Sequence, residues 1–364
     1  MADDTSPHSH EVVPITGRQL TVPEGPVFAL QRAADADYEL GAFRAWAGYR
    51  DLGSDAATNG LALFQHVISF GPSEASGRTG IHCHLAHVHI VIPTSGVGVF
   101  SYDGVVTEAV PGDVIVQHGG TVHDQFSYSY VAAPPEETKR TPISLEPPPA
   151  GASPRSFGFL ELFVPAVIAN VEIVPPAQVT PEDQATAWDH PYHAAGASYF
   201  VQAADDPTAA YRPVVGWPDL EARDCHTWAP SGDLVATWVV RPATGAAGAA
   251  VNLELPGEVA GLTLVFVATG SATLQSGDDE AVVIGPGDGL TAAGVEIGLG
   301  DPSPNLRLVM FKISKRAEGL RERTPSEITR LEAMGRAIIT RRVVRPTDDG
   351  RPVNFLRDED VAPV

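Results

Sequence analysis

Residues 80–96, GIHCHLAHVHIVIPTSG, concentrate four of the twelve histidines of this chain, His82, His84, His87 and His89. In a β-strand successive side chains point to opposite faces, so the first two histidines would share one face, and so would the last two. Two strand histidines one residue apart can reach a single metal ion from the same side. An apolar run, residues 90–93, and a turn signal, residues 94–96, follow them. We therefore expect strands that carry a metal site.

The size and composition of the chain favour two domains built from strands. Its 364 residues exceed the usual length of one domain, and hydrophobic residues make up 43%. The 35 glycines and 32 prolines indicate many short strands joined by tight turns. The predicted fold class is all-β.

Charge and cysteine content exclude several classes of protein. The formal net charge is -21, which argues against nucleic acid or an anionic membrane as a partner. Cys83 and Cys225 cannot form a disulfide framework, and no CxxC motif is present to bind zinc. The first ten residues, MADDTSPHSH, are polar and acidic, and no apolar run is long enough to span a bilayer. We expect a soluble cytoplasmic protein.

A second stretch, residues 110–130, VPGDVIVQHGGTVHDQFSYSY, adds a turn, a Val-Ile-Val strand, a Gly-Gly turn and a strand that begins near His123. Together the two stretches resemble the two motifs of the cupin superfamily. The first motif runs His-x-His, four residues, Glu, six residues, Gly, and here it gives His82, His84, His89 and Gly96. The second gives Gly112, the turn at residues 118–120, His123 and Ser127 at the expected spacing.

Three motif positions differ from the cupin consensus: His89 replaces Glu, His118 replaces Pro and Ser127 replaces Asn. The glycine that precedes the first histidine is also displaced, because Ser76 stands there and Gly77 follows. The resemblance implies that His82, His84, His89 and His123 bind one divalent transition metal as neutral imidazoles. Without a carboxylate ligand the charge of the metal would favour an anionic substrate. Fe(II) is the favoured metal, with Mn, Ni, Cu or Zn as alternatives.

Three further residues are candidates for catalysis. His87 would lie on the face of His89, as a base that meets the substrate or supports the ligands. Gln125 would share the strand face of His123 and contact a ligand. His66, in the strand LALFQHVISF, would line the mouth of the barrel. For each of them ordinary packing inside a strand is the competing interpretation.

An internal repeat indicates a second barrel. Residues 89–100 match residues 263–274 with Gly96 over Gly270, and residues 110–113 match residues 285–288. The second copy has Pro256, Glu258, Thr263 and Gly298 where the first has its four histidines. We therefore expect a bicupin whose second half binds no metal and has a structural role.

The predicted layout is two cupin barrels, that is, double-stranded β-helices of the jelly-roll type, with a C-terminal helix. An N-terminal arm spans 1–42, the metal-binding cupin 43–174, a connection 175–220, the degenerate cupin 221–316, and a helix with its tail 317–364. Residues 324–327 form a capping box for that helix, and Ile328, Leu331 and Met334 begin its apolar face. The long Pro-rich segment 133–155 is a candidate lid over the metal.

The resemblance implies three alternative functions. The first is a metal-dependent, Fe(II)-favoured dioxygenase acting on a small aromatic or enolisable substrate together with O₂. Quercetinases, gentisate dioxygenases and diketone-cleaving dioxygenases are cupins with this type of site. The second is a cyclase, isomerase or decarboxylase in which Zn or Mn acts as a Lewis acid. The third is a non-catalytic binding protein. A homodimer or higher homo-oligomer is expected in each case.

Overall fold

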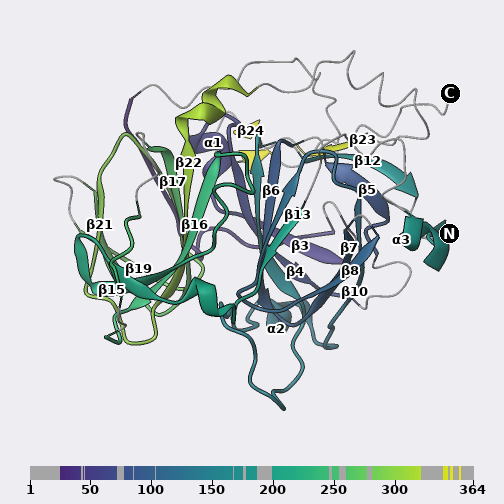
Figure 1. Cartoon of the computed structure of the whole chain (residues 1–364), viewed down its shortest axis with the longest axis horizontal. Coiled ribbons are helices and arrows are strands. Elements are labelled where there is room, and N and C mark those ends of the chain that lie inside the picture. Colours follow the sequence, from purple (N-terminus) through teal and green to yellow (C-terminus); the bar gives the residue numbers. More distant parts are fainter. Residues whose placement is uncertain are drawn as a thin grey trace.

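The computed structural model describes residues 25–353 except 42–43, 45, 72–77, 85, 103, 167, 175–177, 187–198, 246–247, 254–259, 277–280, 321–338, 343–344 and 347–351. The described residues form strands with a few short helices, and the predicted all-β fold class is confirmed. Two barrels lie side by side, with the strands of the first half on the right in Figure 1 and those of the second half on the left.

The first barrel consists of two antiparallel sheets, with strand orders β13-β9-β6-β11-β4-β3-β2 and β23-β12-β5-β10-β7-β8. The strands of the first sheet are β2 (Glu39–Leu40), β3 (Ala47–Asp51), β4 (Leu63–Ser69), β6 (Val88–Ser95), β9 (Val114–His118), β11 (Gly158–Val164) and β13 (Tyr199–Gln202). Those of the second sheet are β5 (Ile81–His84), β7 (Gly98–Tyr102), β8 (Val105–Ala109), β10 (His123–Tyr128), β12 (Ile168–Val174) and β23 (Ile339–Arg342).

The second barrel combines a seven-stranded sheet of order β1-β20-β17-β22-β16-β15-β14 with a three-stranded sheet of order β19-β18-β21. The strands are β1 (Val27–Gln31), β14 (Arg212–Val214), β15 (Trp217–Asp224), β16 (Val235–Pro242), β17 (Ala260–Thr269), β18 (Ala272–Ser276), β19 (Val282–Ile284), β20 (Gly289–Ala293), β21 (Ile297–Gly300) and β22 (Arg307–Ser314). The remaining elements are α1 (Ser54–Ala57), α2 (Pro135–Thr138), α3 (Pro181–Thr186), the 3-10 helices η4 (Pro207–Ala209) and η5 (Lys315–Gly319), and the strands β24 (Arg345–Pro346) and β25 (Pro352–Val353).

The largest apolar core among the described residues lies between the two barrels. Phe64 of β4 packs edge-on against Phe266 of β17 and Phe311 of β22, with ring centroids 6.3 and 5.2 Å apart. Val88, Ile90 and Ile92 of β6 belong to the same core, while the alternate residues of that strand face the interior of the first barrel. Because both faces of β6 are buried, its sequence is an almost continuous apolar run instead of a clean alternation.

The internal repeat corresponds to equivalent strands in the two barrels. β6 lies between β11 and β9, and β17 lies between β22 and β20. Gly96 and Gly270 both have positive φ values, 62° and 71°, and a Cβ at either would collide with a serine side chain, Ser129 or Ser303. Left-handed backbone and close approach together explain why glycine recurs at this turn.

The strand register corrects one alignment in the repeat. His123 lies opposite Tyr102, and Ile297 lies opposite Ser276. Tyr102 and Ser276 are 174 residues apart, the offset of Gly96 and Gly270, so Ile297 and not Gly298 occupies the position of His123. Pro256 and Glu258 lie outside the described residues.

The two barrels exchange strands. The segment before the first barrel in the sequence supplies a strand to the second barrel, and the segment before the second barrel supplies a strand to the first. β1, from the predicted N-terminal arm, pairs with β20 of the second barrel. β13, from the predicted connection, pairs with β9 of the first barrel. These two segments are therefore integral strands of the barrels, because each completes the edge of a sheet.

Segment 133–155 lies away from the histidine cavity in this structure, and its role as a lid stays a prediction. None of its residues lines the histidine cavity. The Ser144 amide donates to the carbonyl of Thr94, near the end of β6 remote from His89. Glu146 accepts a 2.8 Å hydrogen bond from Arg307 of the second barrel, so the segment connects the barrels. The predicted helix at residues 324–338 lies outside the described residues.

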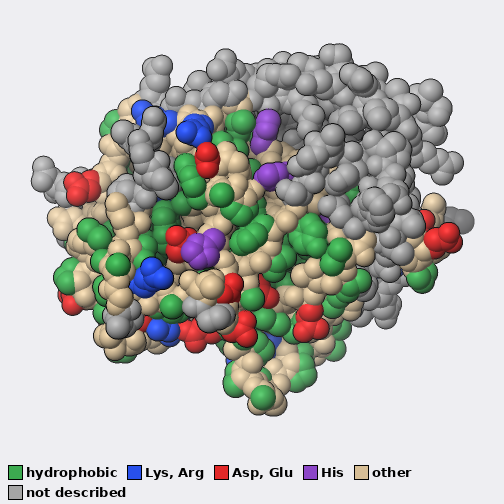
Figure 2. Space-filling model, viewed as in Figure 1, with side chains coloured by type: hydrophobic (Ala, Val, Ile, Leu, Met, Phe, Trp, Pro, Cys, Tyr) green, Lys and Arg blue, Asp and Glu red, His purple; other side chains and the backbone are tan. Residues whose placement is uncertain are grey.

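The surface matches the acidic composition. Figure 2 shows Asp and Glu side chains gathered along the lower part of the face in view. No helix among the described residues is long and apolar enough to cross a membrane.

Candidate metal centre

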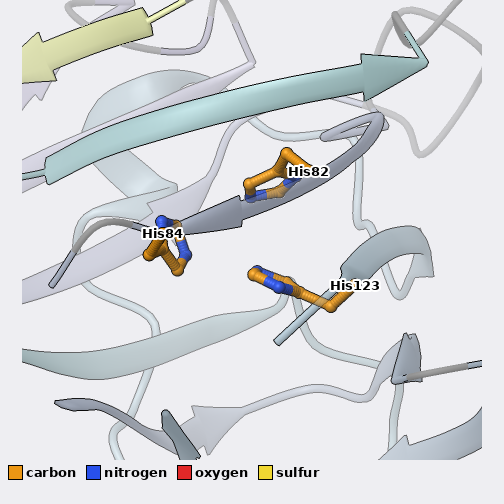
Figure 3. Close-up of side chains that lie close together, drawn as sticks. All are labelled: His82, His84 and His123. Atoms are coloured by element: carbon orange, nitrogen blue, oxygen red, sulfur yellow. The ribbon is translucent and has the colours of Figure 1, made fainter. Parts of the chain in front are cut away.

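Three histidines converge inside the first barrel (Figure 3). His82 and His84 come from β5, and His123 is the first residue of the neighbouring β10, directly opposite His82. One ligating nitrogen of each lies within 4.8 Å of the others, and all three side chains are buried. The ring centroids are 4.3 to 5.0 Å apart. This cluster can hold a divalent metal ion.

Backbone carbonyls orient two of the rings. His82 Nδ1 donates to the Gly80 carbonyl at 2.7 Å, and His123 Nδ1 donates to the Thr121 carbonyl at 3.0 Å. A carbonyl oxygen can only accept, so each Nδ1 carries the proton and each Nε2 keeps a lone pair. This is the usual arrangement of histidine ligands, whose second nitrogen is held by a hydrogen bond outside the coordination sphere.

Burial also keeps these rings neutral. It lowers the pKa of His82 well below the usual value, and the neighbouring His123 lowers it further. Burial lowers the pKa of His123 to about 3. At neutral pH neither ring therefore has to lose a proton before it binds a metal.

His89, the fourth predicted ligand, adjoins the cluster but is not one of the three convergent histidines. Its ring stands perpendicular to His84, with centroids 4.6 Å apart, and stacks on Phe163 at 4.0 Å. His89 Nδ1 lies 3.2 Å from the side-chain nitrogen of Gln117. Its Nε2 is buried and makes no hydrogen bond among the described residues.

A carboxylate that the sequence did not predict lies beside His89. Glu161 of β11 places Oε1 3.6 Å from His89 Nε2, and its Oε2 accepts a 2.5 Å hydrogen bond from Gln65. A signal was present in the sequence, because Glu161 alternates with Phe159 and Phe163 at the inward-facing positions of an apolar strand. The barrel therefore holds a carboxylate, supplied by a strand outside the two motifs.

The histidines line a small cavity of about 60 Å³. That volume has room for roughly two water molecules. Gln117, Gln125, Glu161 and Arg44 line it as well. A metal ion and one or two small ligands therefore fit here, and the body of a larger substrate would have to lie toward the mouth.

The three predicted catalytic residues have different locations. Gln125 is buried in the cavity wall, and its amide nitrogen makes no hydrogen bond among the described residues. His87 is exposed in the turn before β6 and does not line the cavity. His66 is on the opposite face of β4, where it contacts Tyr38 and Thr94 and stacks on Phe266 of the second barrel. The cavity therefore supports a role only for Gln125.

Comparison with known proteins finds structural likenesses at low sequence identity. No protein-family profile and no curated protein matches the chain in sequence. A putative glyoxylate-induced protein from Pseudomonas aeruginosa is 10% identical with a TM-score of 0.48, over 85% of this chain and 97% of that one. The 7S globulin of Momordica charantia is 14% identical with a TM-score of 0.45, over 78% and 83%.

A third solved structure holds a metal. Streptomyces albus HEPD, with 2-hydroxyethylphosphonate and Fe(II) bound, is 12% identical with a TM-score of 0.45, over 85% of this chain and 79% of that one. Since function does not follow from so distant a likeness, it has to be argued from the side chains of the site.

Proposed function

We propose that this two-barrel cupin is a metal-dependent dioxygenase that binds Fe(II) in its first barrel and oxidises a small aromatic or enolisable substrate. The observation that carries the proposal is the convergence of His82, His84 and His123, three buried rings whose ligating atoms lie within 4.8 Å of one another. Three neutral nitrogen ligands on one face suit a first-row transition metal and leave coordination positions open.

His89 is proposed as the fourth ligand. Its Nε2 is buried without a hydrogen bond among the described residues, and a bound cation would satisfy it. This role requires Nδ1 to carry the proton and therefore to face an acceptor. The side-chain oxygen of Gln117 also makes no hydrogen bond among the described residues, and a half-turn of that amide would place it against Nδ1.

The remaining cavity residues would bind and orient the substrate. Fe(II) would supply open positions at which a substrate oxygen and O₂ meet. The side chain of Arg44 lines the cavity, and its positive charge favours an anionic substrate such as an enolate or phenolate. The amide of Gln125 would hydrogen-bond the substrate or O₂. The apolar rings of Trp46, Phe100 and Phe163 would exclude water.

Glu161 favours a second candidate, a Lewis-acid enzyme that uses Zn or Mn. Such chemistry needs a general base beside the metal, and the Glu161 carboxylate lines the cavity 3.6 Å from His89. In that case Glu161 would accept a proton from the bound substrate, and O₂ would not be consumed.

Oxygen uptake separates the two candidates. The metal-free protein is loaded with Fe(II) or with Zn(II) and given catecholic, diketone and flavonol-type compounds. The dioxygenase proposal expects O₂ consumption by the iron form alone, abolished in His123→Ala. Turnover by the zinc form under argon, lost in Glu161→Gln, would instead establish the Lewis-acid enzyme.

A further inference from the structure

The second barrel contains a larger cavity than the first. Its volume is about 620 Å³, against about 60 Å³ around the histidines. Ligand-binding pockets span roughly 300 to 1,000 Å³, so this hollow has the size of a binding site for a small organic molecule. The interiors of small barrels are usually filled by side chains, and the cavity therefore needs an explanation.

Substitutions at specific positions account for the hollow. In the first barrel His89 lies opposite Phe163 on one neighbouring strand and Gln117 on the other. In the second barrel Thr263 lies opposite Lys312 and Ala292 in the same way. An imidazole and an amide have thus been replaced by smaller side chains, and a phenyl ring by a flexible chain that ends in an ammonium group. All three substitutes line the cavity.

The cavity combines one cationic corner with walls of mixed polarity. Lys312 and Thr263 are direct partners across two antiparallel strands and are each 9% exposed. Side chains in such pairs are neighbours on one face of the sheet, so the Lys312 ammonium and the Thr263 hydroxyl can both reach a ligand in the cavity. Met310, Ile297 and Trp217 supply apolar surface elsewhere in the wall.

We propose that the second barrel binds a small monocarboxylate with an apolar body, independently of the metal site. The carboxylate accepts hydrogen bonds from the Lys312 ammonium and the Thr263 hydroxyl, and the apolar body packs against Met310 and Trp217. Glu296 lies exposed among the lining residues, and its charge disfavours a second carboxylate at that end of the ligand. The expected structural role of this half is thereby extended to ligand binding.

Calorimetry on the full-length, metal-loaded protein tests the proposal with phenylacetate as the probe and phenylacetamide as its uncharged analogue. Phenylacetate is expected to bind at least about tenfold more tightly than the amide, the difference expected of one charge-assisted contact. Lys312→Met should weaken the binding of phenylacetate by a similar factor and leave the affinity for phenylacetamide unchanged. Lys315→Met, which removes an exposed lysine three residues away, is the matched control and should bind as the wild type does.

Two further variants test whether binding depends on the cavity and whether it is independent of the metal site. Ala292→Leu retains Lys312 but fills the cavity, and it should abolish phenylacetate binding while circular dichroism shows a folded barrel. His123→Ala should bind phenylacetate normally, because the metal site lies in the other barrel. The proposal is overturned if wild-type protein does not bind phenylacetate, if Lys312→Met binds it unchanged, or if His123→Ala abolishes binding.

Discussion

The direction of each ring, more than the number of histidines, decides which of them can bind a metal in the segment at 80–89. The proton on His82 Nδ1 is held by Gly80, and His123 Nδ1 is held in the same way by Thr121. His87 is exposed in the turn between two strands, where its ring lies outside the cavity. Which histidines can bind a metal is therefore decided by the direction of each ring.

Substitution of single histidines should separate these two groups. We expect His82→Ala and His123→Ala to lose bound metal almost completely, because each removes one of three convergent ligands. His87→Ala should retain the wild-type metal content. Elemental analysis of the purified variants measures this, and metal retained by His123→Ala at wild-type stoichiometry would contradict the ligand set.

Gln117 should tune the affinity for the metal without binding it. The proposed role of His89 depends on the side chain of Gln117 against Nδ1. Loss of such a supporting hydrogen bond typically weakens metal binding by about 10- to 100-fold. We expect this loss in Gln117→Leu, measured by competition with a chelator, and close to wild-type affinity in Gln125→Leu. Equal affinities in the two variants would remove His89 from the ligand set.

His66 should make stability depend on pH. Burial, and to a lesser extent the charge of Arg50, lowers the pKa of His66 well below its usual value of 6.5. Below about pH 6.5 His66 takes up a proton in the unfolded chain but not in the folded chain. The contribution of neutral His66 to the free energy of unfolding is therefore complete above that pH and is lost as the pH falls. The free energy of unfolding should fall by up to about 1.4 kcal/mol per pH unit because of this one group.

The variant His66→Gln isolates this effect. Its free energy of unfolding in urea should fall less steeply than that of the wild type between pH 6.5 and 5, because the ligand histidines titrate equally in both proteins. Parallel curves for the two proteins would show that His66 is protonated in the folded state.

At the scale of elements, β4 and β6 each have two buried faces with different roles. In β6 one face lines the histidine cavity and the other packs against the second barrel. In β4 the same alternation places Gln65 in the interior of the first barrel and His66 between the barrels. A strand residue can therefore be buried and polar without belonging to the metal site.

The interbarrel face of β6 should contribute strongly to stability. Ile90 is fully buried in the core between the barrels. Truncation of a buried isoleucine to alanine costs about 2–5 kcal/mol, so Ile90→Ala should lower the free energy of unfolding by that amount. Val106→Ala, at a residue 63% exposed on β8, should change it by less than about 0.5 kcal/mol. Urea denaturation with both variants measures the difference.

At the scale of the whole molecule, the two barrels hold each other through matching contacts. Within each barrel a carboxylate also holds the end of the exchanged strand: Asp113 before β9 accepts from the Ala204 amide, two residues after β13, and Asp288 before β20 accepts from the Ala33 amide, two residues after β1. Arg223 of the second barrel donates to the Gly112 carbonyl, and Arg50 of the first lies against Gly287. Together with the exchanged strands β1 and β13, these contacts relate the halves by approximate two-fold symmetry.

Arg223 should be one of the strongest links between the barrels. It is 2% exposed and donates to the carbonyls of Ala204 and Gly112 at 2.7 and 2.6 Å. Arg223→Met leaves two carbonyls without these donors, and we expect a loss of about 2–3 kcal/mol in the free energy of unfolding. The exposed ion pair of Arg316 gives a control, since Arg316→Met should change stability by less than about 1 kcal/mol. Equal effects in urea denaturation would contradict this role.

The sequence by itself predicted the two all-β barrels, their repeat and a histidine cluster in the first of them. Those features depend on alternation along single strands and on turns that require glycine, as at Gly96, and both are local properties of the chain. Alternation was also extended through His87, which the structure places in the turn before β6 and not on the strand face of His89.

Tertiary structure alone decided the rest. Glu161 and Gln117 meet His89 only because β11 and β9 flank β6, and no spacing within one segment encodes that register. Spacing within one segment likewise does not predict that His66 faces the second barrel, that segment 133–155 lies away from the cavity, or that β1 and β13 are exchanged between the barrels. Each depends on which distant strands become neighbours, and that is set by packing of the whole chain.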